Sequence, residues 1–165
     1  MRIAGTVQDS IVDGPGLRFT VFTQGCPHGC AGCQNPGTHD PAGGAERAAE
    51  DVAAEMLKNP LTDGLTLSGG EPFAQARDCA AIARAAKDAG LDVWTYTGYT
   101  FEELLNAAAR DADTAELLKL TDTLVDGRFI LSERTLKLRW RGSGNQRLID
   151  VPASLKTGTV CEISL

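Results

Sequence analysis

The sequence has few aromatic side chains, which make up 5% of its 165 residues, and few basic side chains compared with acidic ones. The 16 Lys and Arg residues are outnumbered by 22 Asp and Glu residues, which gives a formal net charge of −6 at pH 7. Proteins bind nucleic-acid backbones through clustered cations, and single strands through stacked aromatic rings as well. The composition therefore argues against a nucleic-acid partner.

The sequence also lacks a long hydrophobic run. No apolar stretch approaches the roughly 20 residues that a membrane-spanning helix needs. Residues 1–9 lack the basic stretch, followed by an apolar one, that marks a secretory signal. We therefore expect no membrane association and a cytoplasmic location, where grouped cysteines indicate metal or redox chemistry rather than disulfides.

The length predicts one domain over residues 1–165. A chain of this size buries roughly 68–70% of its unfolded surface, so it needs no disulfide or metal to fold. The grouping of its cysteines thus points to function rather than to stability.

Hydrophobic patterns predict strands that alternate with helices. Apolar and β-branched residues predict strands at 17–23, 65–68, 92–97, 121–125 and 147–151. Amphipathic spacing predicts helices at 45–57 and 73–89. A third helix is predicted after Thr100, which forms a capping-box signature with Glu103. This alternation predicts an α/β fold whose parallel sheet is wound by right-handed crossovers.

Three of the five cysteines lie in one loop, residues 24–36, directly after the first predicted strand. Cys26, Cys30 and Cys33 are separated mostly by small residues, which leave room for a polynuclear centre. A four-iron cluster takes four ligands, so three thiolates leave one iron open to another group. The alternative is a zinc site with His28 or His39 as the fourth ligand, but the usual second pair of cysteines is missing. The spacing favours iron and sulfur, and we expect His28 to be an exposed loop residue.

The other two cysteines are assigned no cluster role. Cys79 falls on the apolar face of the predicted helix 73–89, where we expect a small buried hydrophobic side chain. Cys161 is expected to be inert or to form adventitious disulfides in air.

Several motifs resemble those of a known family. The C-x3-C-x2-C motif after the first strand resembles the cluster motif of radical S-adenosylmethionine enzymes. Residues 13–18 (DGPGLR) and 69–72 (GGEP) resemble motifs of the enzymes that activate glycyl-radical proteins. Residues 97–99 (TGY), 126–129 (DGRF) and 141–147 (RGSGNQR) are similar to those of the activases that act on anaerobic ribonucleoside-triphosphate reductase. In order, these motifs span nearly the whole chain.

The resemblance implies a cluster, a cofactor and a fold. By similarity, Cys26, Cys30 and Cys33 hold a [4Fe–4S] cluster whose fourth iron binds S-adenosylmethionine. An electron from reduced flavodoxin or ferredoxin then cleaves the cofactor, and the resulting 5′-deoxyadenosyl radical takes a hydrogen atom from a glycine Cα of the reductase. The implied fold is a partial, open (β/α) TIM-like barrel, since a complete barrel needs about 250 residues.

The resemblance also assigns cofactor contacts. Gly69, Gly70, Glu71 and Pro72 resemble the element beside the methionine amino group, where glycines let the backbone approach a ligand closely. Glu71 is equally suited to capping the following helix. The backbone around Gly32, Gln34 and Asn35 is expected near the adenine. The family often has an aromatic residue at position 32 and His at position 34, and this sequence has neither.

Five more residues are candidates for cofactor or partner contacts, each beside a simpler interpretation. Asp13 and Arg18 flank a Gly-Pro-Gly turn, and turn formation alone explains that sequence. Asp126 ends the fourth predicted strand, where an ordinary turn is the alternative. Arg141 and Arg147 belong to a basic stretch whose alternative is a solvated hairpin, and we favour a cofactor or docking role.

The leading hypothesis is therefore an oxidoreductase that activates anaerobic ribonucleoside-triphosphate reductase by forming a glycyl radical on it. Activation of another glycyl-radical enzyme, of the formate-lyase type, is an alternative. Those activases are generally longer, and some carry an insert with extra cysteine pairs that this sequence lacks. A non-catalytic iron–sulfur or zinc module is the third hypothesis.

Overall fold

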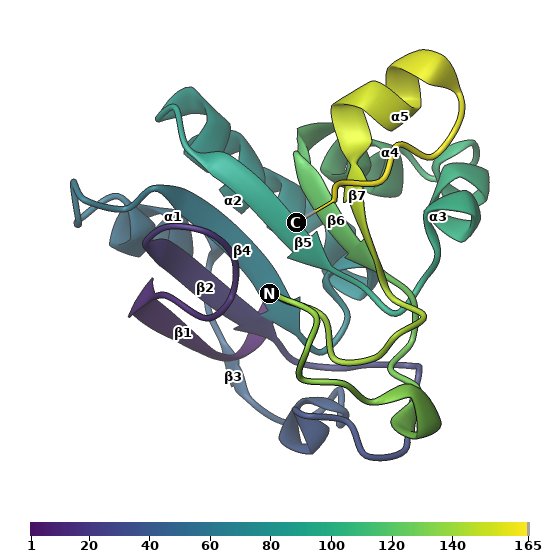
Figure 1. Cartoon of the computed structure of the whole chain (residues 1–165). Helices are drawn as coiled ribbons and strands as arrows, with labels where there is room; N and C mark the ends of the chain where they lie inside the picture. Colours follow the sequence, from purple (N-terminus) through teal and green to yellow (C-terminus); the bar gives the residue numbers. More distant parts are fainter. Residues whose placement is uncertain (165) are drawn as a thin grey trace.

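A computed structural model describes residues 1–164 and shows them folded around one mixed β-sheet (Figure 1). Within this range seven strands lie in the order β3-β1-β2-β4-β5-β6-β7. Their bounds are β1 Arg2–Ser10, β2 Arg18–Thr23, β3 Ala45–Glu46, β4 Gly64–Gly69, β5 Asp92–Tyr96, β6 Thr123–Asp126 and β7 Arg147–Asp150.

The four central strands, β2, β4, β5 and β6, are parallel. Thr23 at the end of β2 pairs with Gly69 at the end of β4, and Tyr96 at the end of β5 pairs with Val125 of β6. The carboxyl ends of these strands therefore lie along one edge of the sheet. Strand β4 is a nearly continuous buried run, as expected of a parallel strand covered on both faces.

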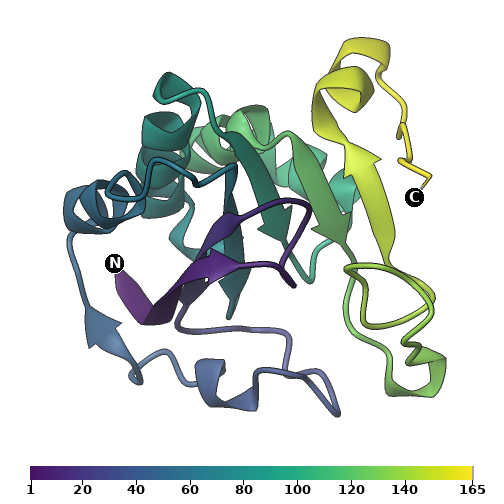
Figure 2. The ribbon, with the colours of Figure 1, turned by 60° about the vertical axis from the view of Figure 1, so that its left-hand side comes forward.

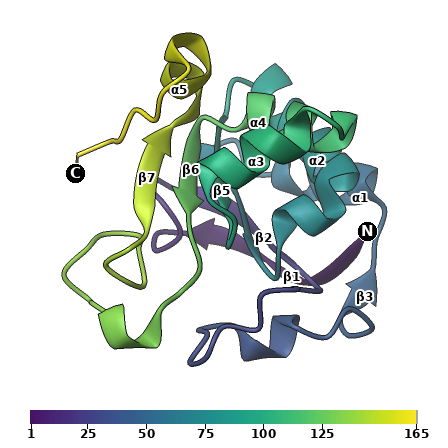
Figure 3. The ribbon, with the colours of Figure 1, turned by 90° about the vertical axis from the view of Figure 1, so that its right-hand side faces the viewer.

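Helices α1 to α4 cover one face of the sheet (Figure 3). The main apolar core lies between this helical layer and the sheet, with Phe19, Leu65 and Ile82 fully buried in it. A smaller apolar cluster around Trp94 and Leu148 lies apart from this core. The helix bounds are α1 Ala49–Met56, α2 Ala76–Asp88, α3 Phe101–Ala108, α4 Ala112–Leu120 and α5 Val151–Thr157. Among residues 1–164, no helix combines the length and the apolar character needed to cross a bilayer.

The α/β class is confirmed, but the prediction of a parallel sheet holds only for the centre. Strands β1 and β3 at one side and β7 at the other pair in the antiparallel direction. The connections explain part of this, because β1 turns directly into β2 without a crossover helix. In the described residues, the strand order ends at β3 and β7 without pairing them, so the sheet is open.

Most of the predicted helices and strands are confirmed, and some differ because contacts with distant residues determine their structure. The capping box is confirmed, since the Glu103 N–H donates to Thr100 Oγ1 (3.2 Å) and the Thr100 N–H donates to Glu103 Oε2 (2.8 Å). The predicted helix 45–57 starts too early, because Ala45–Glu46 pairs with β1 at the sheet edge and α1 begins only at Ala49. The predicted helix 73–89 is a 3-10 turn, Pro72–Gln75, that continues as α2.

Besides β3, three of the described α-helices and strands were not predicted: β1, α4 and α5. Strand β1 mixes buried and exposed residues without regular alternation, so it lacks the period-2 signal. Helix α5 begins at Val151, which the sequence pattern placed in the last strand. The Asp150 carboxylate accepts the Ala153 N–H (2.9 Å), and Pro152 occupies the first turn, which together start a helix there.

Arg18 joins three parallel strands from inside the fold and is only 1% exposed. Its guanidinium donates to Thr66 Oγ1 (2.7 Å) and the Leu65 carbonyl (2.6 Å) of β4, and it forms an ion pair with Asp92 of β5 (3.0 Å). It also lies over the Trp94 ring at 5.8 Å. Because every polar group of this side chain is engaged inside the sheet, its observed role is structural.

We expect Arg18→Ala to lower the free energy of unfolding by about 3 kcal/mol, because it leaves buried acceptors and Asp92 without their partner. Chemical denaturation of the purified protein measures this loss. Arg77→Ala is the matched control, since Arg77 is exposed on α2, and it should change stability by less than about 0.5 kcal/mol. Equal losses in the two variants would contradict the structural role of Arg18.

Candidate functional site

Loops that follow the parallel strands meet at the carboxyl edge of the sheet (Figure 2). Residues 24–44 follow β2, Gly70 follows β4, Thr97 and Gly98 follow β5, and residues 127–146 connect β6 to β7. Together with the turn before β2, they line an open cavity of about 520 Å³. That volume is within the range of cofactor pockets, roughly 300–1,000 Å³.

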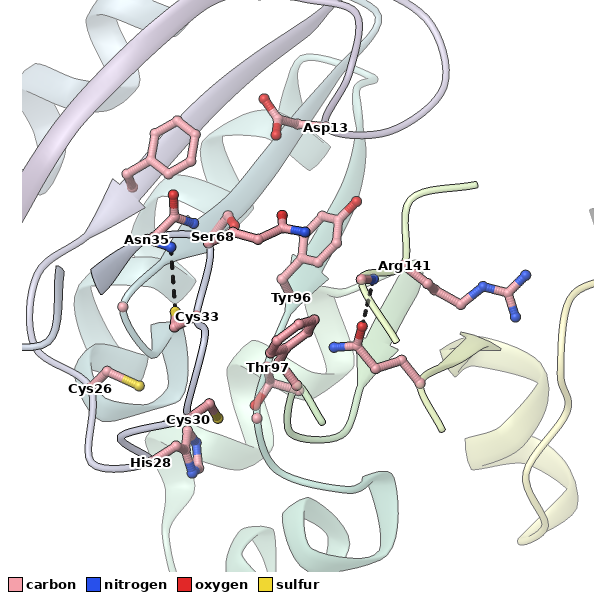
Figure 4. Close-up of a pocket in the computed structure, with 18 of the residues that line it drawn as sticks. Asp13, Cys26, His28, Cys30, Cys33, Asn35, Ser68, Tyr96, Thr97 and Arg141 are labelled. Carbon is pink, nitrogen blue, oxygen red and sulfur yellow. Dashed lines mark hydrogen bonds between the residues drawn. The ribbon is translucent and has the colours of Figure 1, made fainter. Parts of the chain in front are cut away.

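The three clustered cysteines all line this cavity (Figure 4). Their thiols are free and half-buried. Backbone hydrogen bonds shape the loop: the Cys26 N–H donates to the His39 carbonyl (3.1 Å), and the Cys33 N–H donates to the Cys30 carbonyl (3.2 Å). The Asn35 N–H donates to Cys33 Sγ (3.3 Å).

The chemistry of the donor set suits an iron–sulfur cluster. Three thiols line one cavity, and thiolates are the ligands that four-iron clusters use. In the part of the chain that the structure describes, no three Cys, His, Asp or Glu side chains are grouped as the ligands of one metal ion.

The expectation that His28 is exposed is wrong, because its side chain is only 4% exposed. His28 Nε2 lies 2.8 Å from Glu71 Oε2, and its ring packs edge-on against Tyr99 with centroids 4.6 Å apart. A carboxylate only accepts hydrogen bonds, so the histidine donates from Nε2. That nitrogen is therefore not available as a zinc ligand.

Glu71 is fully buried, and its carboxylate receives four hydrogen bonds. Oε1 accepts the Phe73 N–H (3.1 Å) and the Thr97 hydroxyl (2.9 Å), and Oε2 accepts the Gly98 N–H (2.9 Å) and His28. The Glu71 side chain thus caps the turn after β4, which is the capping role that the sequence suggested beside cofactor binding. It also ties together the loops that follow β2, β4 and β5.

Gly69 and Gly70 line the cavity, whereas Glu71 and Pro72 do not. Gly69 has φ +92°, and a Cβ there would come within 2.6 Å of the β2 backbone. A Cβ at Gly70 would lie 2.4 Å from the Gly25 carbonyl oxygen. The two glycines therefore let the end of β4 pack directly against the start of the cysteine loop, with backbone rather than side chains facing the cavity.

Of the three residues expected near the adenine, Gln34 and Asn35 line the cavity and Gly32 does not. Gly32 has φ +72°, and a Cβ there would lie 2.8 Å from Leu131 Cδ1 of the β6–β7 loop. A side chain at position 32 would have to displace Leu131 and adopt a backbone conformation that favours glycine.

Asp13 lines the cavity from the turn before β2, and its carboxylate accepts the Ser10 hydroxyl (2.5 Å) and the Thr20 hydroxyl (3.2 Å). Arg18 of the same motif lies away from the cavity, inside the sheet. The structure therefore separates the two residues that the sequence grouped as candidates.

Asp126 and Arg147 pair with each other rather than line the main cavity. The Asp126 carboxylate accepts the Phe101 N–H (2.8 Å) and the Arg147 guanidinium (2.5 Å). Glu102 also contacts Arg147 (2.8 Å), and these two carboxylates raise the pKa of Arg147. Arg141 does line the main cavity, but its guanidinium extends away from the cysteines (Figure 4).

The thiols of Cys26 and Cys79 both have a pKa above the usual value for cysteine. Burial raises the pKa of Cys26, backbone N–H groups of His28 and Gly29 oppose the rise, and Glu71 adds to it. Burial raises the pKa of Cys79 much further, so that its thiol stays protonated. The expectation that Cys79 is a buried hydrophobic residue is confirmed, since it is 0% exposed within α2.

The chain matches one family model and a group of known proteins, of which three follow. The model is described as "4Fe-4S single cluster domain" and matches residues 12–149. Proteins from Vibrio cholerae (36% identity; 82% of this chain, 89% of the relative) and enterobacteria phage T4 (36%; 83% and 86%) match the chain. So does one from Escherichia coli K12 (37%; 82% and 90%). All three are named "Anaerobic ribonucleoside-triphosphate reductase-activating protein".

The chain belongs to this family of activating proteins. The resemblance noted in the sequence is thereby confirmed, and the matched family model is that of an iron–sulfur domain. The match to residues 12–149 includes the cysteine loop, the two glycines after β4 and the whole β6–β7 loop.

Sequence reasoning missed part of the cavity wall in this family member. Tyr96, Thr97, Phe129, Trp140 and Gln146 line the cavity without having been assigned to it. Burial raises the pKa of Tyr96, the Asp13 charge adds to the rise and Arg18 opposes it, so the phenol is neutral. Tyr96 could have been predicted to line the cavity, because it ends a parallel strand and ligand sites lie at such ends. No sequence pattern predicts that Trp140 lines the cavity, because its position depends on the conformation of a long loop.

We expect Glu71→Gln to lower the free energy of unfolding by about 2–3 kcal/mol, because either amide orientation puts an NH2 group against a backbone N–H. Denaturation of the metal-free protein measures the loss, and iron bound per chain after reconstitution should fall with it. Glu50→Gln, at an exposed position on α1, is the control and should behave like the wild type. An unchanged stability of Glu71→Gln would show that the four contacts do not hold the loops.

Proposed function

We propose that this protein activates anaerobic ribonucleoside-triphosphate reductase by radical S-adenosylmethionine chemistry. The observation that carries the proposal is one cavity lined by the three cysteines of a C-x3-C-x2-C loop and by the two glycines after β4. Membership in a family of activating proteins with a single 4Fe–4S cluster domain supports it. In this proposal residues 1–165 act as a single radical S-adenosylmethionine domain.

In the proposal, Cys26, Cys30 and Cys33 hold a [4Fe–4S] cluster and leave one iron for the amino and carboxylate groups of S-adenosylmethionine. The chemistry supplied by the bound groups is one-electron cleavage of the sulfonium S–C5′ bond, which yields methionine and a 5′-deoxyadenosyl radical that takes a hydrogen atom from a glycine Cα. The electron donor supplies the one electron consumed, and the products are methionine, 5′-deoxyadenosine and a glycyl radical on the reductase.

The protein's own residues bind, orient and keep out water. Backbone groups of Gly69 and Gly70 are exposed to the cavity and supply hydrogen bonds to the methionine part of the cofactor. Gln34 and Asn35 flank the adenine part. Apolar and aromatic side chains such as Phe22, Tyr96 and Phe129 line the rest of the wall and restrict water around the radical.

The role of Glu71 in this proposal is to position the loops rather than to bind the cofactor, because all its acceptor positions face protein donors. Asp13 faces the cavity and is our candidate for a contact with the cofactor or with the glycine segment. The electron donor we propose is reduced flavodoxin or ferredoxin. A cluster held by thiolates also suits the reducing cytoplasm, where we place the reaction.

The proposal predicts a division among the cysteines. Cys30→Ala should lose the cluster and all reductive cleavage of S-adenosylmethionine, whereas Cys79→Ala should retain both, because Cys79 is buried in α2. Anaerobic reconstitution, iron analysis and chromatography of 5′-deoxyadenosine measure this. A colourless wild-type protein that binds zinc and forms no 5′-deoxyadenosine would contradict the proposal, as would equal loss in both variants.

The partner is tested separately. Mixed with anaerobic ribonucleoside-triphosphate reductase, S-adenosylmethionine and a reductant, the reconstituted protein should produce the electron paramagnetic resonance doublet of a glycyl radical. The same mixture with a formate lyase in place of the reductase is the control and should stay silent. A doublet on the formate lyase alone would assign the protein to the other class of partner.

A further inference from the structure

One exposed segment next to the cavity concentrates positive charge in an acidic protein. Residues 128–141, called the basic segment below, carry five cationic side chains and one acidic one, Glu133, while the whole chain has net charge −6. Within residues 1–164, none of the five forms an ion pair with this chain. The five cations are Arg128, Arg134, Lys137, Arg139 and Arg141.

What distinguishes these five cations is their clustering, because they fall within 14 positions, whereas other surface cations such as Lys58, Arg77 and Arg110 lie singly on or after different helices. Arg47, Arg84 and Lys87 each contact a carboxylate of a neighbouring element, with Glu55, Glu116 and Asp122 as their partners. Cations that cluster without partners repel one another and contribute nothing to the stability of the isolated fold. Their positive potential is therefore free to attract an external acidic group.

The basic segment is anchored, so its charges are held in place. The Thr135 N–H donates to the Gly142 carbonyl (3.1 Å), and the Gly144 N–H donates to the Glu133 carbonyl (2.8 Å). Trp140 packs edge-on against Trp94 of β5, with ring centroids 5.3 Å apart. The cations are thus displayed on a folded loop that is fixed to the sheet.

Exposed apolar side chains lie in the basic segment and in the turn before β2, and both of these segments contribute residues to the cavity wall. In the basic segment, Leu136 is 88% exposed and Leu131 is 52% exposed. On the turn before β2, Ile11 and Val12 are 74% and 73% exposed, and Val12 lines the same cavity as Trp140 and Arg141. Exposed apolar groups beside unpaired charges are typical of protein-binding surfaces.

We infer that the basic segment, together with Ile11 and Val12, forms a docking surface for an acidic, partly apolar surface of the protein that delivers its glycine to the cavity. This inference rests on the proposed function, because it takes the occupant to be the reductase. Charge complementarity steers that protein to the cavity mouth, and the apolar side chains then bury area against it. A nucleic acid is the less favoured occupant, since the rest of the chain is strongly acidic.

The test uses two triple charge reversals with the same change in net charge. Arg134→Glu/Lys137→Glu/Arg139→Glu alters the basic segment at residues that do not line the cavity. Lys58→Glu/Arg77→Glu/Arg110→Glu alters exposed positions on or after α1, α2 and α3, and is the matched control. Binding to immobilised anaerobic ribonucleoside-triphosphate reductase is measured at low and high salt, and partner-free cleavage of S-adenosylmethionine is measured in parallel.

The expected result is an association rate at least ~10-fold lower for the basic-segment variant at low salt, with most of the salt dependence lost. The control variant should bind like the wild type, and both variants should cleave S-adenosylmethionine at the wild-type rate without the partner. Equal weakening in the two variants, unchanged binding in the basic-segment variant, or tighter wild-type binding to an oligonucleotide than to the reductase would overturn the inference.

A second pair of variants tests the apolar part. Leu136→Ser should weaken binding to the reductase, whereas Leu61→Ser, at another exposed leucine (71% exposed), should not. Equal effects would overturn the assignment of Leu136. Failure of the wild type to cleave S-adenosylmethionine would instead reject the proposed function, and the binding comparison distinguishes the two failures because it requires no turnover.

Discussion

The geometry of the cavity depends on one buried carboxylate, that of Glu71. A carboxylate without partners in such a place would cost several kcal/mol, and here two backbone N–H groups, a hydroxyl and a histidine offset that cost. The donors come from the loops that follow β2, β4 and β5, so the same contact that satisfies the charge fixes those loops to one another. The positions of the cysteine loop, of the glycines that line the cavity and of Thr97 are therefore fixed relative to one another before any ligand binds.

The direction of the strands in the sheet determines where these loops meet. Because β2, β4, β5 and β6 are parallel, all their following loops lie at one edge, and residues far apart in sequence become neighbours. The antiparallel strands at both sides leave the sheet open. The long β6–β7 loop supplies another part of the cavity wall, because it brings Phe129, Trp140 and Arg141 to the cavity.

The features that could be predicted from the sequence are those that depend on residues close to one another in the chain. The central strands, the capping box at Thr100 and the burial of Cys79 arise from local patterns and were predicted correctly. So was the grouping of the three cysteines, because their spacing alone brings them together. The contact between His28 and Glu71 joins residues 43 positions apart, and Ala45–Glu46 becomes a strand only because β1 lies beside it. Such long-range pairing leaves no local signal, and neither does the packing of Trp140 on Trp94.

The close approach of the β6–β7 loop to the cysteine loop has a consequence for communication across the molecule. Gly32 lies between Cys30 and Cys33, and a Cβ there would lie 2.8 Å from Leu131 Cδ1 of the basic segment. A Cβ at Gly142 would likewise lie 3.3 Å from Gln34 Nε2, so the two loops also approach each other beside the third cysteine. An inward displacement of the outer segment would therefore reach the backbone between two cysteines without passing through the hydrophobic core. The proposed docking surface is thus next to the loop that holds the three cysteines.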